Sequence, residues 1–189
     1  FCYRLRGIKL PGVRVIEEWA FFLCTALAEV EFGNKLESIG RAAFGRTTSM
    51  TSIKLPKVKV IGIGAFQKCE QLTEVKLSED LERIEGAAFW RCRRLRPIAM
   101  PLKDNLLVGD VFDECDNLSQ VDLVGGIHKT ISSLLLDSWR DEMNDEIDHI
   151  NQILPIADRY YKTEAIQQWM ERVLQRIEHY TSEHYALLK

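Results

Sequence analysis

The sequence predicts an α/β fold: a solenoid of stacked parallel β rungs with short helical or 3-10 turns, followed by an α-helical hairpin. Two observations predict it. Apolar residues recur every 22 or 23 residues over about two thirds of the 189-residue chain. Beyond residue 126 they recur instead every three or four residues, the period of a helix. We therefore divide the chain into a solenoid, residues 1–127, and a two-helix segment, residues 128–189.

The repeat unit, here called a coil, is clearest between Leu72 and Leu95. Val75 and Leu77 stand two apart, so they share one face of a strand. A second apolar pair and an Ala-Phe pair follow before Leu95 restarts the cycle. The strand, the apolar pair and the aromatic residue thus predict one complete circuit of a solenoid.

Equivalent residues form three columns through the chain. The leading column holds Leu5, Leu27, Met50, Leu72, Leu95 and Leu118. The strand column holds Ile8, Val30, Ile53, Val75, Ile98 and Val121. The aromatic column holds Phe21, Phe44, Phe66, Phe89 and Phe112. One coil cannot enclose its own Phe and Leu, so we expect neighbouring coils to stack and bury them in one continuous core.

The cycle carries a family resemblance. In one coil its residues are Ile61, Gly62, Ala65, Phe66, Cys69 and Leu72. With their equivalents, they resemble the BspA-like class of leucine-rich repeats over five whole coils and two partial ones, from residue 1 to about residue 126. The chain departs from that pattern where Glu17 and Glu85 replace Gly and Thr47 replaces Cys. Residues 101–110 keep the length of the repeat but lose most of its pattern, which leaves the outer loop of the fifth coil unassigned.

The resemblance implies a non-enzymatic binding or surface role and names no ligand. The helical tail resembles that of leucine-rich-repeat proteins of unicellular algae. Three functions fit these features. The first is a scaffold that binds a protein partner and self-associates through its C-terminal helices. The second is a cell-surface adhesion or structural protein, and the third is a regulatory part of a larger enzyme.

The cysteines predict a buried column. Cys2, Cys24, Cys69, Cys92 and Cys115 all occupy one repeat position, and Thr47 fills the same position in the remaining coil. Such a column is typical of small apolar side chains beside the Phe residues. Because Thr47 shares this column, we favour buried free thiols over disulfides or a metal site. The absence of any C-x-x-C pair argues further against zinc.

Charge and composition exclude little. The formal net charge is −3, with +1 on residues 1–127 and −4 on residues 128–189. No apolar run reaches the length of about 20 residues that spans a bilayer. Because the chain begins with Phe1 inside a repeat, we expect the solenoid to be truncated at its N-terminus. The sequence therefore leaves the cellular compartment open.

The strands present two outward columns, which are the first candidate partner-binding face. Its predicted members are Glu29, Glu31, Lys54, Glu74 and Lys76. Lys54 and Lys76 fall on adjacent rungs, a like-charge pair that mildly disfavours folding. The alternative is an ordinary solvated polar face. Pro97 lies in the same columns and cannot donate to a strand ladder, so pairing should weaken there.

Trp90 and Arg91 belong to a basic cluster that is the second candidate. Arg beside an aromatic ring can bind phosphate or nucleic acid. However, Glu82 and Glu85 lie close in sequence and the whole chain is acidic. Nucleic-acid binding is therefore disfavoured, and a solvated convex surface with one packed Trp is the alternative.

The tail predicts two antiparallel helices. The stripe of the first is Ile131, Leu135, Trp139, Met143, Ile147, Ile150 and Leu154. Thr130 would cap this helix and Pro155 would end it. The second helix starts at Thr163 and Glu164. Its heptad-like seam, which favours coiled-coil packing, is Ile166, Met170, Val173, Ile177, Tyr180, His184 and Leu187.

No catalytic arrangement can be recognised. All four histidines lie in the tail, and His179 and His184 are five apart rather than on one helical face. There is no Gly-rich phosphate loop. We accordingly predict no catalytic residue, no cofactor and no metal.

Overall fold

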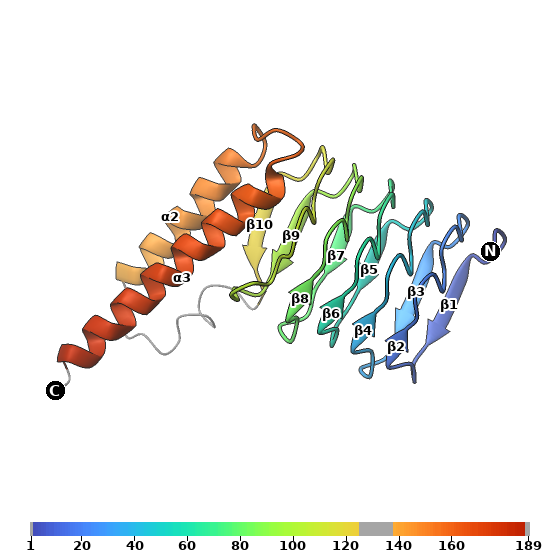
Figure 1. Ribbon diagram of the computed structural model, residues 1–189, viewed down its shortest axis with the longest axis horizontal. Coiled ribbons are helices and arrows are strands. Elements are labelled where there is room, and N and C mark those ends of the chain that lie inside the picture. The colour runs from blue at the N-terminus through green and yellow to red at the C-terminus, as the bar shows by residue number, and fades with distance from the viewer. Residues whose placement is uncertain (1, 125–137, 188–189) are drawn as a thin grey trace.

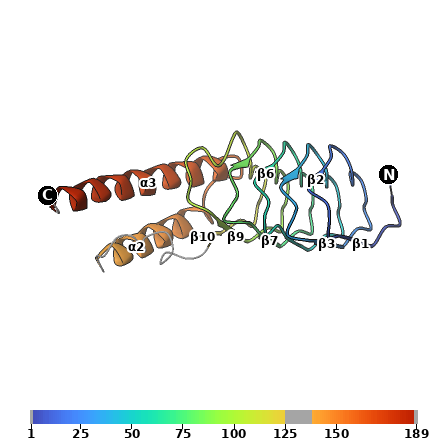
Figure 2. The same ribbon diagram turned by 90° about the horizontal axis from the view of Figure 1, so that it is seen from below.

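The computed structural model describes residues 2–124 and 138–187, apart from the side chains of residues 138–140 and 180–187. It is a parallel β-solenoid of about five coils followed by two helices, which confirms the predicted fold class (Figure 1). The helices continue the long axis at the C-terminal end of the solenoid, as Figure 2 also shows. The predicted boundary at residue 127 lies outside the described residues.

One side of the solenoid carries the longer strands. They are β1 (Gly7–Leu10), β3 (Glu29–Phe32), β5 (Ser52–Lys54), β7 (Glu74–Lys76), β9 (Pro97–Met100) and β10 (Gln120–Leu123). All ladders between them are parallel and keep the predicted strand column in register, for example Ile53 with Val75 and Val75 with Ile98. The ladder is interrupted between β3 and β5.

Pro97 weakens pairing as predicted. It is the first residue of β9 and is aligned with Gln120 of β10. On the opposite side of β9, pairing with β7 starts only at Ile98. A residue without an N–H group is tolerated there because it begins the strand.

A second parallel sheet is built from two-residue strands. These are β2 (Val15–Ile16), β4 (Ser38–Ile39), β6 (Val60–Ile61) and β8 (Arg83–Ile84). In the fifth coil this strand is reduced to one bridge, between Ile84 and Leu107. Residues 101–110, where the sequence pattern is lost, thus still place a Leu at the expected rung.

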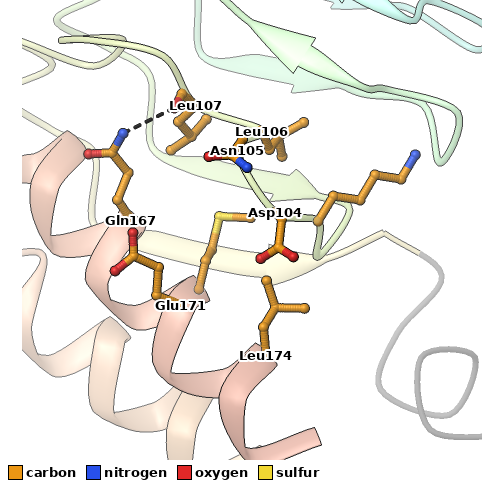
Figure 3. A pocket seen from close by; sticks show the side chains of 9 residues that line it. Asp104, Asn105, Leu106, Leu107, Gln167, Glu171 and Leu174 are labelled. Carbon is orange, nitrogen blue, oxygen red and sulfur yellow. Dashed lines mark hydrogen bonds between the residues drawn. The ribbon is translucent and has the colours of Figure 1, made fainter. Parts of the chain in front are cut away.

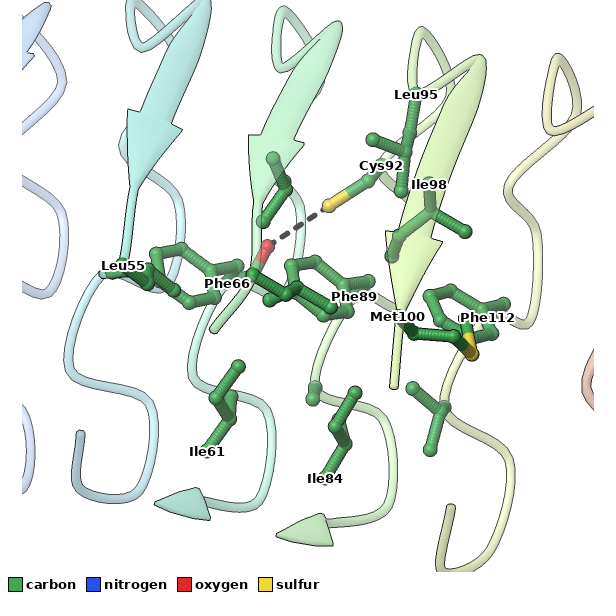
Figure 4. Packing of buried hydrophobic residues seen from close by; sticks show 14 of the residues in the cluster. Leu55, Ile61, Phe66, Ile84, Phe89, Cys92, Leu95, Ile98, Met100 and Phe112 are labelled. Carbon is green, nitrogen blue, oxygen red and sulfur yellow. Dashed lines mark hydrogen bonds between the residues drawn. The ribbon is translucent and has the colours of Figure 1, made fainter. Parts of the chain in front are cut away.

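The Phe column forms one stack through the core (Figure 4). Ring centroids of Phe44 and Phe66 lie 5.4 Å apart and those of Phe66 and Phe89 5.3 Å apart, with the rings nearly parallel. Phe44, Phe66, Phe89 and Phe112 have no exposed surface. Phe21, at the N-terminal end of the stack, is only partly buried. The recurrence of Phe in the sequence therefore does correspond to one hydrophobic spine.

The turns after the short strands contain residues in the left-handed backbone conformation, which was not predicted from the sequence. They contain 3-10-type hydrogen bonds, for example from Gln67 N–H to Gly64 O at 2.9 Å. The same turns contain residues with positive φ, which fall two residues before and two residues after the Phe of each coil. One column is Trp19, Ala42, Gly64 and Ala87, and the other is Leu23, Arg46, Lys68, Arg91 and Glu114. Glycine is the residue best suited to this region, yet it occupies only one of these nine positions.

The buried cysteines hydrogen-bond to the Phe column. Cys92 Sγ donates to Phe66 O at 3.1 Å, and Cys115 Sγ donates to Phe89 O at 3.1 Å. All five cysteines are free, as predicted, but Cys2 is exposed rather than buried. Burial raises the pKa of Cys115 to about 12, so its thiol is protonated and inert at neutral pH.

The tail forms an antiparallel pair of helices, α2 (Ser138–Ile153) and α3 (Lys162–Leu187). Met143, Ile150 and Leu154 of the predicted first stripe are buried, and Ile147 is partly buried. Of the second seam, Ile166, Met170 and Val173 are buried. The predicted cap Thr130, together with Ile131 and Leu135, lies outside the described residues, as do the side chains of Trp139, Tyr180, His184 and Leu187.

Trp169 was not recognised from the sequence. It is the largest completely buried side chain among the described residues, but it stands beside the heptad seam rather than in it. It joins the same hydrophobic cluster as the solenoid core. The hairpin is therefore packed onto the end of the solenoid, with α2 against β10.

Candidate functional site

The five predicted residues of the strand face lie on one side of the solenoid. Glu29 and Glu31 belong to β3, Lys54 to β5, and Glu74 and Lys76 to β7, and all five are exposed. Since residues two apart point to the same side of a strand, they face the same solvent region. Their repeat spacing was sufficient to predict this.

Most charges on this face have partners. Lys9 Nζ forms a salt bridge of 2.8 Å with Glu31 Oε2 on the neighbouring rung. Lys76 Nζ forms one of 3.1 Å with Glu74 Oε1 on the same strand. Lys54 is aligned with Lys76, which confirms the like-charge pair. Among the residues that the structure describes, Lys54 has no carboxylate within salt-bridge distance. All these groups are largely solvated, so their mutual pairing contributes little stability.

Trp90 and Arg91 lie elsewhere, on the turns that follow the short strands. The structure does not bring them together with the strand face. Trp90 Nε1 donates to Glu114 at 3.2 Å and Arg91 Nε donates to it at 2.8 Å. The Arg91 guanidinium also lies 4.6 Å from the Trp90 ring centroid. Both side chains are partly buried.

Glu114 is the centre of an ion network that joins the fifth coil to the tail. Its side chain is 7% exposed, and its Oε2 also accepts a hydrogen bond from Arg159 Nη2 at 2.6 Å. Burial raises the pKa of Glu114, but the hydrogen bond and charge of Arg91, with the charge of Arg159, outweigh it and hold the pKa below its ordinary value. The sequence could not reveal this network because Arg159 is 45 residues away.

The tail also satisfies backbone groups that other coils satisfy with their neighbours. Thr163 Oγ1 accepts the Phe112 N–H at 2.8 Å, and Arg159 O accepts the Glu114 N–H at 2.9 Å. Gln167 Nε2 donates to Leu107 O at 3.1 Å (Figure 3). Asn151 Oδ1 accepts the N–H of Val121 on β10 at 2.8 Å. The hairpin thus replaces a further coil at four positions of the last rungs.

Lys162 holds the same junction from inside. It is 2% exposed, and its Nζ donates to Leu118 O at 2.6 Å and Leu154 O at 3.0 Å. Burial lowers the pKa of this amine. A buried ammonium that reaches carbonyl groups of both parts is a structural link between solenoid and tail.

A crevice lies where α3 crosses the loop of the fifth coil (Figure 3). Its volume is about 80 Å³, with Asn105, Leu107, Gln167 and Glu171 among the lining residues. That space holds only a few water molecules. The residues that the structure describes contain no cluster of three or more metal-ligating side chains. No helix within them has both the length and the apolar character to cross a membrane.

Stacked parallel rungs, a Phe spine and a 22- or 23-residue period define a leucine-rich-repeat solenoid. A family model, the BspA type leucine rich repeat region, matches six copies over residues 1–119. The chain belongs to this family. Family members and their structural neighbours are typically non-enzymatic scaffolds, and such repeats generally mediate protein–protein interaction or surface adhesion.

The solved structures similar to the chain include two leucine-rich repeat proteins. A leucine rich repeat protein of T. pallidum is 33% identical, with a TM-score of 0.61 over 64% of this chain and 57% of that one. A leucine-rich repeat protein of Bacteroides ovatus is 32% identical, with a TM-score of 0.51 over 53% of this chain and 26% of that one. This chain therefore spans little more than half of the first protein. A search of curated proteins gives no match. The similarity of the tail to algal proteins stays a prediction.

Proposed function

We propose that this protein is a non-enzymatic scaffold that binds a protein partner on the outer face of β3, β5 and β7. The observation that carries the proposal is the register of this face. On the paired strands β5 and β7, Lys54 is in register with Lys76 and Glu74 with Ser52. Exposed Glu29 and Glu31 extend the same face on β3, which contacts β5. A fixed pattern of both signs suits recognition of a partner with the complementary pattern.

The rigidity of the rungs supports the proposal. Beneath the face, Ile53, Val75 and Leu77 are buried in the same hydrophobic cluster as the Phe spine. The backbone that presents the charges is thus held by the core, so little conformational entropy is lost on binding. Trp90 and Arg91, the other predicted contacts, point to a separate surface and play no part in this one.

The test is a comparison of charge-reversed variants. Lys54→Glu with Lys76→Glu reverses the only two Lys residues of the described β5 and β7 strands. Lys35→Glu with Lys59→Glu makes the same change in net charge on exposed loops before β4 and β6. Proteins from the native host that bind the wild type are identified by quantitative mass spectrometry. We expect a partner lost with the first variant and retained with the second; equal loss from both would contradict the proposal.

Self-association through the helices stays a second prediction. Light scattering of the full chain over a range of concentrations tests it. A mass that remains that of one chain, 21.8 kDa, would contradict it.

A further inference from the structure

Three cations line up along the turns after the short strands, away from the strand face. Arg46, Lys68 and Arg91 occupy one repeat position in successive coils, and all three have positive φ. Because their backbone conformation and repeat position are the same, their side chains leave the solenoid in a common direction. We call this row the cationic ridge. The Phe rings of the same coils are 5.3–5.4 Å apart, which sets the spacing of the row.

The cationic ridge borders an open groove. Its volume is about 370 Å³, and besides the three cations it is lined by Thr25, Thr48 and Glu70, with Leu23 at one end. Three positive charges face one carboxylate, and two hydroxyl groups add hydrogen-bond donors. The groove therefore favours an anionic, hydrogen-bonding ligand.

Two of the three cations are available. Within the described residues, neither Arg46 nor Lys68 has a carboxylate at salt-bridge distance. Arg46 is exposed, and Lys68 Nζ lies 4.8 Å over the Trp90 ring, a contact that leaves its charge unneutralised. Arg91, in contrast, is held by Glu114. Free positive charge is thus concentrated on the two middle coils.

Glu114 is an example of a carboxylate bound by the cationic ridge. It occupies the same repeat position one coil further along, and its two oxygens accept Trp90 Nε1 and Arg91 Nε. An Arg of the ridge is therefore already bound by a protein carboxylate placed one rung away. The rungs of Arg46 and Lys68 offer the same cationic position without such an acid.

We propose that the cationic ridge binds an acidic, extended segment of a partner protein, with its carboxylates on Arg46 and Lys68. Alternate side chains of an extended peptide are about 6.6–6.8 Å apart. The coils are closer together than this, with Phe rings 5.3–5.4 Å apart. The long, flexible side chains of Arg and Lys can spread to match the wider spacing of the peptide. A carboxylate is favoured over a phosphate because the anion that Arg91 and Trp90 Nε1 already bind is the carboxylate of Glu114. This surface is distinct from the strand face and its role does not depend on it.

The probe is a fluorescein-labelled 12-residue peptide of alternating Glu and Ser, titrated with the full chain and followed by anisotropy. Arg46→Gln with Lys68→Gln removes two ridge charges but keeps the side-chain stems. Lys35→Gln with Lys59→Gln is the matched control on exposed loops before β4 and β6. We expect binding to weaken at least about fivefold in the ridge variant, by less than about twofold in the control, and to fall as salt is raised.

Four results would overturn the proposal. The peptide could fail to bind at low salt, or both variants could weaken binding equally, which would make net charge the cause. A 12-nucleotide oligothymidylate could bind more tightly than the peptide, so that phosphate rather than carboxylate would be the ligand. Finally, Lys54→Gln with Lys76→Gln could abolish peptide binding while the ridge variant retains it. That last result would place the acidic ligand on the strand face and would leave the proposed function intact.

Discussion

The interior coils and the last coil make the same backbone hydrogen bonds with different chemical groups. In the interior, Phe66 N–H donates to Ala88 O at 2.8 Å and Phe89 N–H to Val111 O at 3.0 Å. At the end, Phe112 N–H donates to the hydroxyl of Thr163 at 2.8 Å. Main-chain acceptors are present in every residue, so an interior junction tolerates sequence change there. At the cap, Arg159 O is a main-chain acceptor, but the bonds to Thr163 and Asn151 depend on particular side chains and tolerate fewer substitutions.

The core gives the largest expected effect. Phe66→Ala leaves a cavity in the middle of the stack and should lower the free energy of unfolding by about 3–5 kcal/mol. Phe21→Ala is the matched change at the end of the stack, where the ring is only partly buried, and should cost less. Urea denaturation followed by circular dichroism measures both. Equal losses would mean that the Phe residues are not one graded stack.

The cap is tested by removing one hydroxyl. Thr163→Val keeps the shape but leaves the buried Phe112 N–H without an acceptor, which should cost about 1–3 kcal/mol. In the control, Thr73→Val removes an exposed hydroxyl that donates to Thr51 O, and a change within about 0.5 kcal/mol is expected. Hydrogen exchange of the Phe112 amide adds a local measurement: faster exchange is expected only in the first variant. Unchanged exchange would contradict the capping role.

At two residues with positive φ, we expect opposite substitutions to change the stability in opposite directions. Gly64 and Ala87 occupy the same repeat position, with φ of 60° and 56°. Gly64→Ala should destabilise by about 1 kcal/mol, since a Cβ disfavours this conformation. Ala87→Gly should stabilise by up to about 1 kcal/mol, reduced by the greater entropy of Gly in the unfolded chain. Thermal unfolding of both variants measures these changes. A shift of the melting temperature in the same direction for both would contradict the equivalence of Gly64 and Ala87.

The smallest effect is expected in acid. The pKa of Glu114 lies below its ordinary value of 4.5 in the folded state, so the unfolded state binds more protons between the two values. The stabilisation is complete above pH 4.5 and is lost as the pH falls through the folded pKa. It is small because solvent screens the charges of Arg91 and Arg159, whose side chains are 35% and 38% exposed.

Melting temperatures from pH 7 to pH 3 measure this contribution. The wild type should melt above Glu114→Gln at neutral pH and approach it in acid. A difference that persists unchanged at low pH would exclude titration of Glu114 as its cause.

Sequence reasoning succeeded where the signal repeats. The Phe spine, the strand register, the Cys column and the like-charged Lys54–Lys76 pair all follow from residues that return at a fixed interval. It also placed five candidate contacts on one face. Trp90 and Arg91 were also predicted as contacts, and the structure places them on a separate surface, on the turns that follow the short strands. Trp169 was missed because a heptad pattern describes contacts between helices, not contacts with a solenoid end.

The sequence by itself determined the period, the spine and the two-helix character of the tail, because each is a local pattern repeated along the chain. Only the tertiary structure decided how the solenoid ends. Thr163, Arg159, Asn151 and Gln167 have no pattern of their own. Their roles arise from backbone groups 30 to 60 residues away that would otherwise lack partners. Contacts made once, between distant segments, leave no periodic trace in a single sequence.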